Sequence, residues 1–424
     1  MTQQAKNVLY AQAGGVSAVI NASAAGVIES VRQHPGQFGK IYAAINGIKG
    51  VLEEALVDLT DMSQADIEYL KYLPGAAFKA CRFDLGDEQQ RADQYQRVLD
   101  VFTAYDIGYF FYNGGNGSML TAQKVADYCS RHGHPVTCIG VAKTIDNDLA
   151  LSHCSPGFGS AAKYLATSFF EATLDILSMH QTSTKFFVME TMGRNVGWLS
   201  LAPGLVQDAM PDVPIIILPA ERPFRREAFL NEVKRLIDLH GYCVCSVSEG
   251  IRTENGQFIS IEGEEHANGH TFTQLGGVSE KLAHLVADSL NIKTHSANPD
   301  YLQRSASHMV SLTDWQMGYQ AGSSAVEAAL RGEHGVLPVI EKTDDTPFIW
   351  RFKTVALQAV ADLEKGVPDE FIREDGMGIT AEALDYLRPL VQGEHFVSFK
   401  QGLPNIKPLE LKNVHKQLAE FIDA

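Results

Sequence analysis

The chain has 424 residues, 45% of them hydrophobic and 20% charged, which is ordinary for a soluble globular protein of two or three domains. Its 35 Lys and Arg against 51 Asp and Glu leave a net charge of −16, which argues against nucleic acids and anionic membranes as partners. The apolar runs are strand-length, no signal-peptide pattern is present, and the six cysteines form no Cys-x-x-Cys pair, so we expect a cytoplasmic protein.

Apolar runs alternate with helical periodicities along the chain, as in proteins built from strand-then-helix units. Strands are predicted at 7–13, 40–45, 107–112, 135–141, 184–190, 213–219, 242–248 and 336–340. Helices are predicted at about 17–31, 119–129, 157–178, 227–240, 276–290, 315–330, 352–363 and 380–391. Two successive series of such units predict an α/β fold of two doubly wound, three-layer α/β/α domains, followed by a mostly helical C-terminal extension.

The first strand leads through Gly14-Gly15 into a helix. A strand, a glycine turn and a helix N-terminus together make a place for phosphate, although glycine pairs also form ordinary tight turns. The loop-like segment 74–87 contains Lys79 and Arg82. This cationic loop either reaches the same phosphate site or lies on the solvated surface.

The strand at 107–112 runs into the glycine loop Asn113-Gly114-Gly115-Asn116-Gly117-Ser118, which a helix follows. Three glycines and a serine at a helix start expose backbone N–H groups to an anion. The loop matches neither the Walker pattern nor the dinucleotide G-x-G-x-x-G spacing. The loop therefore predicts a phosphate site more strongly than the first glycine pair does. The alternative is that its glycines only form a turn between the strand and the helix.

The strand at 135–141 delivers Lys143-Thr144-Ile145-Asp146-Asn147-Asp148 to the carboxyl end of a sheet. Open α/β sheets bind ligands at that edge. Asp146 and Asp148 lie two residues apart, so in an extended segment both side chains face the same site. One would act as a base and the other would be a supporting group. The ammonium group of Lys143 is a compact positive charge, which suits the binding of a phosphate. A helix cap or a turn is the competing interpretation, because Asp-Asn-Asp is common in turns.

Several stretches together resemble the phosphofructokinase family. They are Gly114-Gly115-Asn116-Gly117-Ser118, Thr144 to Asp148, Met192-Gly193-Arg194, Glu249 and Gln303-Arg304, in the family's order. The resemblance covers the chain to about residue 304 and the rest only loosely. It implies phosphoryl transfer to the 1-hydroxyl of fructose 6-phosphate, as in glycolysis. It also implies a phosphoryl-donor domain of 1–156 with part of 305–424, a sugar-phosphate domain of 157–304, and an extension at 315–424 packing on both.

The resemblance assigns roles to single residues. Asp146 would be the general base, Asp148 its support, and Thr144 a contact to the sugar or the transferring group. The donor phosphates would be held by Gly15, Arg82, Gly115, Gly117 and Ser118. The sugar phosphate would be held by Met192, Gly193, Arg194, Glu249, Tyr301 and Arg304. Lys185 stands where the family often has an arginine that crosses a subunit interface, which implies a homodimer or homotetramer.

The donor is either pyrophosphate or ATP. Lys143 and Tyr301 resemble the pyrophosphate-using branch, whereas Gly117 resembles the ATP enzymes; we favour pyrophosphate. Asn116 replaces a Mg²⁺-supporting aspartate, yet an amide oxygen still suits Mg²⁺, so Asn116 and Asp148 are the expected metal ligands. The scattered histidines have no zinc spacing.

The sequence leaves two other functional hypotheses open. One is a catalytically silent sugar-phosphate-binding subunit, suggested by Asn116 but opposed by the intact Asp146 and Arg194. The other is a nicotinamide-linked dehydrogenase, suggested by the strand-glycine-helix units but opposed by the missing G-x-G-x-x-G.

Overall fold

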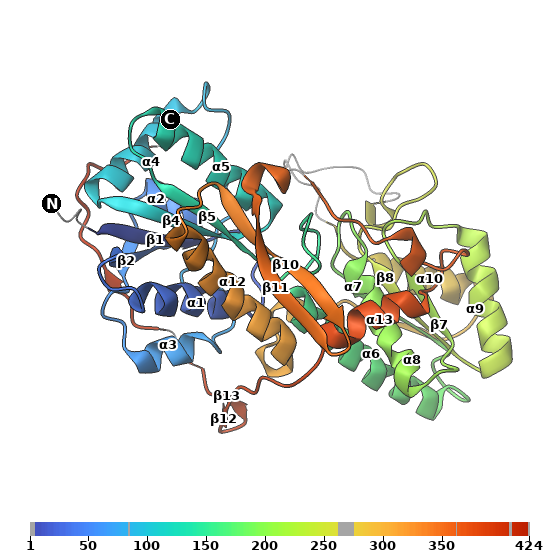
Figure 1. Ribbon diagram of the computed structural model, residues 1–424. Helices are drawn as coiled ribbons and strands as arrows, with labels where there is room; N and C mark the ends of the chain where they lie inside the picture. Colours follow the sequence, from blue (N-terminus) through green and yellow to red (C-terminus); the bar gives the residue numbers. More distant parts are fainter. Residues whose placement is uncertain (1–4, 84, 262–274, 362, 407–408, 423–424) are drawn as a thin grey trace. The chain divides into compact units, whose positions relative to one another are not determined.

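The structure is a computed structural model that describes residues 5–83, 85–261, 275–361, 363–406 and 409–422 (Figure 1). The chain divides into two compact units, each assembled from separate stretches of sequence. Unit 1 comprises 1–158, 305–364 and 393–424, and unit 2 comprises 159–304 and 365–392. Each unit has its own largely parallel sheet covered by helices, so the predicted doubly wound α/β class is confirmed.

Unit 1 is built on an eight-stranded sheet. Its strands are β1 (Lys6–Gln12), β2 (Phe38–Ala44), β3 (Leu56–Asp58), β4 (Ile107–Gly114), β5 (Thr137–Ala142), β10 (Val336–Asp345), β11 (Phe348–Ala356) and β14 (Lys412–Asn413). They lie in the order β11-β10-β5-β4-β1-β2-β3-β14. The neighbours from β10 to β2 are parallel, and the outer pairs are antiparallel. The carboxyl ends of β1, β4 and β5 therefore meet at one edge.

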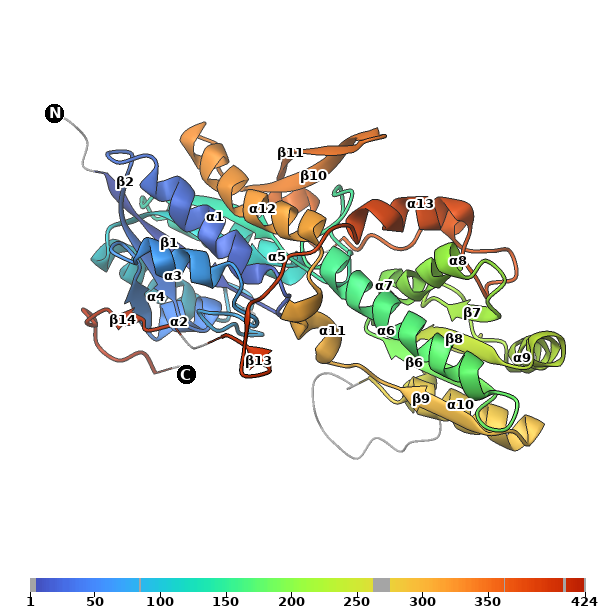
Figure 2. The same cartoon turned by 90° about the horizontal axis from the view of Figure 1, so that it is seen from below.

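Helices cover both faces of this sheet. Core contacts place α1 (Ile20–Arg32), α3 (Gln64–Leu70) and α12 (Leu312–Leu330) on one face, and α2 (Gly47–Leu52), α4 (Ala92–Ala104) and α5 (Asn116–Arg131) on the other. In both views α1 and α12 lie side by side (Figure 1, Figure 2). A Cβ on Gly26 would lie 2.1 Å from the Tyr319 carbonyl oxygen, and one on Gly322 would lie 2.0 Å from that of Ser23. Glycine is needed at both crossing points because the two backbones touch.

Unit 2 is built on a parallel four-stranded sheet in the order β7-β8-β6-β9. The strands are β6 (Phe186–Thr191), β7 (Ile215–Leu218), β8 (Cys243–Ser248) and β9 (Thr294–Ala297). The long helices are α6 (Phe158–Met179), α9 (Arg226–His240) and α10 (Val278–Leu290); α9 and α10 share one hydrophobic core with the sheet. The shorter elements include α7 (Trp198–Leu201), α8 (Val206–Ala209), α11 (Leu302–Ser305) and α13 (Ala381–Leu390).

The C-terminal part is less helical than expected. A helix is predicted at 352–363, but residues 348–356 form β11, which pairs antiparallel with β10. The reason is the period of the segment, since Phe348, Trp350 and Phe352 alternate with the more exposed Ile349 and Arg351, which is the pattern of a strand. Beyond them come α13, as predicted, and the short strands β12 (Phe399–Lys400) and β13 (Leu403–Pro404). The structure also contains α4, which is absent from the predictions above.

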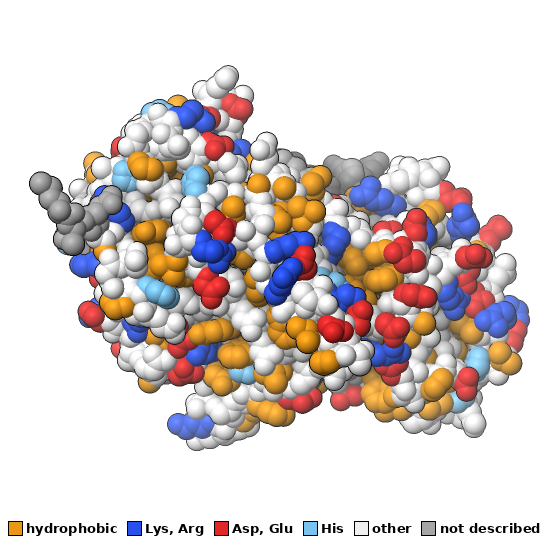
Figure 3. All heavy atoms as spheres, viewed as in Figure 1, with side chains coloured by type: hydrophobic (Ala, Val, Ile, Leu, Met, Phe, Trp, Pro, Cys, Tyr) orange, Lys and Arg blue, Asp and Glu red, His pale blue; other side chains and the backbone are white. Residues whose placement is uncertain are grey.

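Charged side chains of both signs are mixed on the surface (Figure 3). On the face drawn in Figure 3, Lys and Arg side chains lie among Asp and Glu side chains. Within the described ranges, no helix combines the length and the apolar character needed to cross a bilayer. Of the six cysteines, five are buried and Cys81 is partly exposed, in line with structural thiols.

Candidate active site

Unit 1 gathers three predicted loops at one sheet edge. Gly14-Gly15 follows β1, Gly115 follows β4 and Lys143 follows β5, and these three strands are neighbours in the sheet. The Lys143 backbone N–H donates to the Gly114 carbonyl at 3.1 Å, and a Cβ on Gly115 would lie 3.8 Å from that of Thr144. The topology therefore brings together residues that lie up to 130 positions apart in the sequence.

Lys143 is almost completely buried, with 3% of its surface exposed. Its ammonium group donates to the Gly15 carbonyl oxygen, and a Cβ on Gly14 would lie 3.5 Å from Nζ. The side chain therefore crosses from β5 to the first glycine turn. A buried ammonium is strongly favoured beside an anion. Its place over Gly14-Gly15 marks the position that a negative group would take.

The second glycine loop forms the N-terminus of α5, a helix of 16 residues. Gly115 is the N-cap and supplies no side-chain cap, and the Ser118 N–H donates to the Gly115 carbonyl at 3.0 Å, so the N–H groups of Asn116 and Gly117 are the ones that suit an anion. Ser118 packs against Gly114, where an added Cβ would lie 2.1 Å from Ser118 Oγ. Gly117 is exposed, and a Cβ there would meet nothing within 4 Å. A larger residue would fit at Gly117 without disturbing the loop.

Asn116 and Asp148 face each other across this edge. Asn116 Nδ2 donates to Asp148 Oδ2 at 3.1 Å. Asn116 Oδ1 and Asp148 Oδ1 are both buried without a hydrogen-bond partner. Burial raises the pKa of the Asp148 carboxyl above its ordinary value, against the lowering effect of hydrogen bonds and of the Lys143 charge. Two orphaned oxygens of these types fit Mg²⁺, which prefers oxygen ligands and keeps several from water or substrate.

The loop after β5 is fixed by its own hydrogen bonds. Asp146 is half-buried, and its N–H donates to Thr144 Oγ1 at 3.1 Å. Asn147, between the two aspartates, is fully buried in the left-handed conformation, with φ of 57°. Its Oδ1 accepts the Ser155 N–H at 3.0 Å, which ties the two ends of the loop together. The segment bends at residues 145–146, and the Asn147 hydrogen bond fixes the backbone between the two aspartates.

Unit 2 gathers a second set at the carboxyl ends of β6 and β8. Thr191 and Ser248, the last residues of these strands, are paired, so Met192 and Glu249 begin adjacent loops. The Gly193 N–H donates to Glu249 Oε1 at 3.2 Å. Gly193 has φ of 139°, and a Cβ there would lie 2.3 Å from the Val196 carbonyl oxygen, so only glycine fits.

Gln303 joins the 301–304 segment to this set. The buried Gln303 side chain accepts the Met192 N–H at 3.1 Å and donates to the Asp300 carbonyl at 3.0 Å. The Arg304 guanidinium lies 3.9 Å from the centre of the Tyr301 ring, which is 62% exposed. A guanidinium stacked on an exposed ring is held in place while its N–H groups remain directed to solvent or to an anion.

Lys185 stands apart from its predicted site, whereas Arg82 begins beside its own. Lys185 precedes β6, at the opposite end of that strand from Met192, so within unit 2 it does not join Glu249 and Arg304. Arg82 is exposed and follows Cys81, which bridges Ala13 at the end of β1 and accepts the Gly14 N–H at 3.0 Å. Arg82 therefore begins beside the first glycine turn.

Sequence reasoning gave no role to Asn147, Gln303 or Asp314. Asp314, 2% exposed, accepts the Gly157 N–H at 2.8 Å and so holds the end of the 143–157 loop. Asn147 was detectable, because asparagine adopts a positive φ more readily than most other residues. Gln303 belongs to a recognised pair with Arg304. Asp314 had no local signal, since its partner lies 157 residues away.

Comparison with known proteins completes this set of observations. A family model described as phosphofructokinase matches residues 7–329. The pyrophosphate–fructose 6-phosphate 1-phosphotransferase of Halomonas elongata is 47% identical over 98% of this chain and 99% of its own. Crystal structures of pyrophosphate-dependent phosphofructokinases are also similar. The one from Nitrosospira multiformis has a TM-score of 0.91 at 43% identity, covering 98% of this chain and 100% of its own. The one from Marinobacter aquaeolei has a TM-score of 0.90 at 45% identity, covering 99% and 100%.

Proposed function

The chain belongs to the phosphofructokinase family, and on that premise we propose that it transfers a phosphoryl group reversibly from pyrophosphate to the 1-hydroxyl of fructose 6-phosphate. The products are fructose 1,6-bisphosphate and phosphate. The observation that carries the choice of donor is the buried Lys143 ammonium on the Gly15 carbonyl, over the first glycine turn. Relatives that cover nearly the whole chain bear names with the same donor and acceptor.

Asp146 acts as the general base. It takes the proton of the 1-hydroxyl as that oxygen attacks the terminal phosphorus of pyrophosphate, and phosphate leaves. Its loop is held by Asn147 and by Asp314, so the carboxylate keeps one orientation. Phosphoryl transfer depends mostly on positioning and charge neutralisation, and this loop supplies the positioning.

The donor phosphates lie against cations and N–H groups of unit 1. The first turn of α5 offers the N–H groups of Asn116 and Gly117 to an anion, whereas the Ser118 N–H donates to the Gly115 carbonyl at 3.0 Å. The Lys143 ammonium, held beside the first glycine turn by the Gly15 carbonyl, neutralises charge on the leaving phosphate. Arg82 adds a second positive charge from the solvent side.

Mg²⁺ would be held by Asn116 Oδ1 and Asp148 Oδ1, the two orphaned oxygens. Within the described residues no cluster of three His, Cys, Asp or Glu side chains forms a metal site. A metal with only two protein ligands arrives best as a complex with the substrate phosphates. Bound there, it would neutralise charge on the transferring phosphoryl group.

Fructose 6-phosphate binds to unit 2. Glu249 and Arg194 contact the sugar hydroxyls, beside the fixed N–H groups of Met192 and Gly193. Arg304 and Tyr301 take the 6-phosphate, since a stacked guanidinium suits the planar recognition of phosphate oxygens. Lys185 lies at the opposite end of β6 from Met192, which fits a side chain that reaches the site of a second subunit in a homodimer or homotetramer.

ATP is the second candidate donor, because the exposed Gly117 leaves open space at the α5 N-terminus. The test is the initial rate with fructose 6-phosphate and Mg²⁺, comparing pyrophosphate and ATP at equal concentration. We expect turnover with pyrophosphate only. Turnover with ATP only would refute the donor assignment, and fructose 6-phosphate binding without turnover would point to a silent subunit.

A further inference from the structure

One carboxylate of unit 2 holds the 192–197 loop without belonging to the sugar contacts proposed above. The first two N–H groups of this loop are accepted by side chains from two other segments. At the other end of the loop, the Gly197 N–H donates to Glu221, at 2.9 Å to Oε1 and at 3.1 Å to Oε2. Arg194 lies between these attachments, so the position of its backbone depends on both ends.

The turn that carries Glu221 is itself fixed on both sides. Before the turn, the Ile217 N–H of β7 donates to the Met377 carbonyl at 3.2 Å. After the turn, the Phe224 N–H donates to the Arg252 carbonyl at 2.7 Å. The carboxylate is therefore carried by backbone of defined position, as a residue that orients a neighbouring loop requires.

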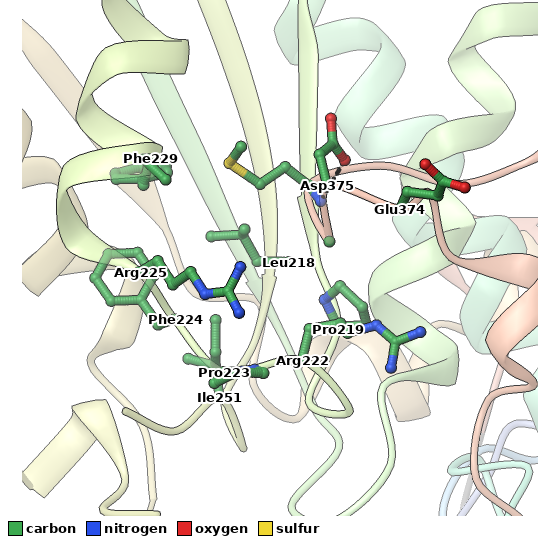
Figure 4. A pocket seen from close by; sticks show the side chains of 13 residues that line it. Leu218, Pro219, Arg222, Pro223, Phe224, Arg225, Phe229, Ile251, Glu374 and Asp375 are labelled. Atoms are coloured by element: carbon green, nitrogen blue, oxygen red, sulfur yellow. Dashed lines mark hydrogen bonds between the residues drawn. The ribbon is translucent and has the colours of Figure 1, made fainter. Parts of the chain in front are cut away.

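The residues next to Glu221 face different surroundings. The turn borders a cavity of about 330 Å³, which Pro219, Arg222 and Pro223 line and Glu221 does not (Figure 4). Arg222 pairs at 2.8 Å with Asp369, whose side chain is 83% exposed. An exposed pair of this kind contributes little to stability. Of these neighbouring side chains, Glu221 is therefore the one that connects the turn with the 192–197 loop.

The contact between the turn and the loop leaves no free space. A Cβ on Gly197 would lie 2.5 Å from Glu221 Oε2 and 2.7 Å from a backbone nitrogen of the same turn. Gly197 has φ of −97°, which alanine also adopts, so glycine is needed here for the close approach alone. Within the loop, a Cβ on Gly193 would lie 2.3 Å from the Val196 carbonyl oxygen. Because the loop is this tightly folded, a displacement of Gly197 reaches Arg194.

One oxygen of Glu221 makes both of its shorter hydrogen bonds. Oε1 accepts the Val367 N–H at 2.9 Å as well as the Gly197 N–H at 2.9 Å. Oε2 makes only the longer contact to Gly197. An amide carbonyl in the place of Oε1 would keep both short bonds, whereas alanine would leave two N–H groups without their acceptor.

We propose that Glu221 is a positioning residue for fructose 6-phosphate, which holds Gly197 and thereby sets the position of Arg194. This inference rests on the proposed function, in which Arg194 contacts the sugar. Loss of the acceptor then weakens fructose 6-phosphate binding far more than pyrophosphate binding. A residue that only stabilised unit 2 would lower the folded fraction and the apparent kcat, and would leave the KM for fructose 6-phosphate unchanged.

Two variants disturb the contact from opposite sides. Glu221→Ala removes both acceptor oxygens, and Gly197→Ala adds the Cβ that the turn excludes. Each should raise the KM for fructose 6-phosphate at least about tenfold, while the KM for pyrophosphate stays within about threefold. Glu221→Asp keeps the charge but withdraws the oxygens by one methylene, so it folds more readily and should raise the same KM at least about threefold.

Three further variants separate positioning from stability. Glu221→Gln should stay within about threefold of the natural chain, because its amide oxygen replaces Oε1. Arg222→Gln, on the same turn, should leave the KM for fructose 6-phosphate within about twofold. Glu54→Ala should do the same while lowering stability, because Glu54 is 1% exposed and accepts the Leu418 N–H of unit 1 at 3.1 Å.

The dissociation constant for fructose 6-phosphate, measured by calorimetry, makes the same comparison without turnover, and urea unfolding gives the stability of each variant. An unchanged KM and dissociation constant in Glu221→Ala, Glu221→Asp and Gly197→Ala overturns the positioning role. Equal impairment of Glu221→Gln and Glu221→Ala also overturns it. Failure of the natural chain to bind fructose 6-phosphate contradicts the proposed function instead, so the two failures are distinguishable.

Discussion

Asn147→Ala tests whether the residue between the two aspartates orients them. The substitution removes the acceptor of the buried Ser155 N–H, which costs about 1–3 kcal/mol. Alanine also tolerates φ of 57° poorly, which adds about 1 kcal/mol. The free energy of unfolding should therefore fall by about 2–4 kcal/mol. Because catalytic geometry is sensitive to displacements near 1 Å, kcat should fall at least about tenfold.

The assay is urea unfolding followed by tryptophan fluorescence, together with kcat and KM. Asn147→Gly is the matched control, since glycine accepts the positive φ while losing the same side-chain contacts as alanine. It should recover about 1 kcal/mol relative to alanine. An alanine variant within about 0.5 kcal/mol of the natural chain and with unchanged kcat would refute the positioning role of Asn147.

Asp146→Asn should lower kcat by about 10²–10⁴ while fructose 6-phosphate binding by calorimetry stays within a few-fold, and near-normal turnover would remove the base assignment. Lys143→Gly should impair pyrophosphate use far more than sugar binding; an unchanged rate at subsaturating pyrophosphate would exclude Lys143 from the donor site. Burial raises the pKa of the Glu221 carboxyl, so its proton is bound more tightly in the folded chain than in the unfolded chain. The free energy of unfolding therefore falls as the pH rises above about 4.3, the pKa of an unperturbed glutamate. The urea midpoint of Glu221→Gln relative to the natural chain should therefore increase with pH, and a flat or falling difference contradicts this.

Most of the fold was predictable because its strands carry strong local signals. The runs at 107–112 and 135–141 are apolar and continuous, as strands buried on both faces must be, and they became β4 and β5. The helix predicted at 352–363 was wrong, because residues 348–356 form β11. Polar and apolar residues alternate along β11 instead of forming a continuous apolar run, and antiparallel pairing with β10 decided its structure. The division into units was harder to predict, since residues 365–392 return to unit 2 after unit 1 has resumed at 305.

The candidate site was predictable where one short segment carries the chemistry. Lys143, Asp146 and Asp148 occur within six residues after a strand, so their shared edge follows from the topology. The partners that hold them depend on long-range contacts that leave no local pattern. Asp314 reaches Gly157 across 157 positions, and Asn116 reaches Asp148 across 32. The catalytic roles of these residues remain predictions until variants are measured.

The pairing of Met377 with β7 has a consequence during synthesis of the chain. β7 is the outermost strand of its sheet, and the Ile217 N–H finds its partner only when residue 377 has left the ribosome. At ~5–20 residues per second, that interval lasts on the order of ten to thirty seconds. Throughout it, an apolar strand edge, Ile215 to Leu218, is open to pairing with another nascent chain. Premature termination before residue 377 should therefore yield aggregated rather than merely inactive protein.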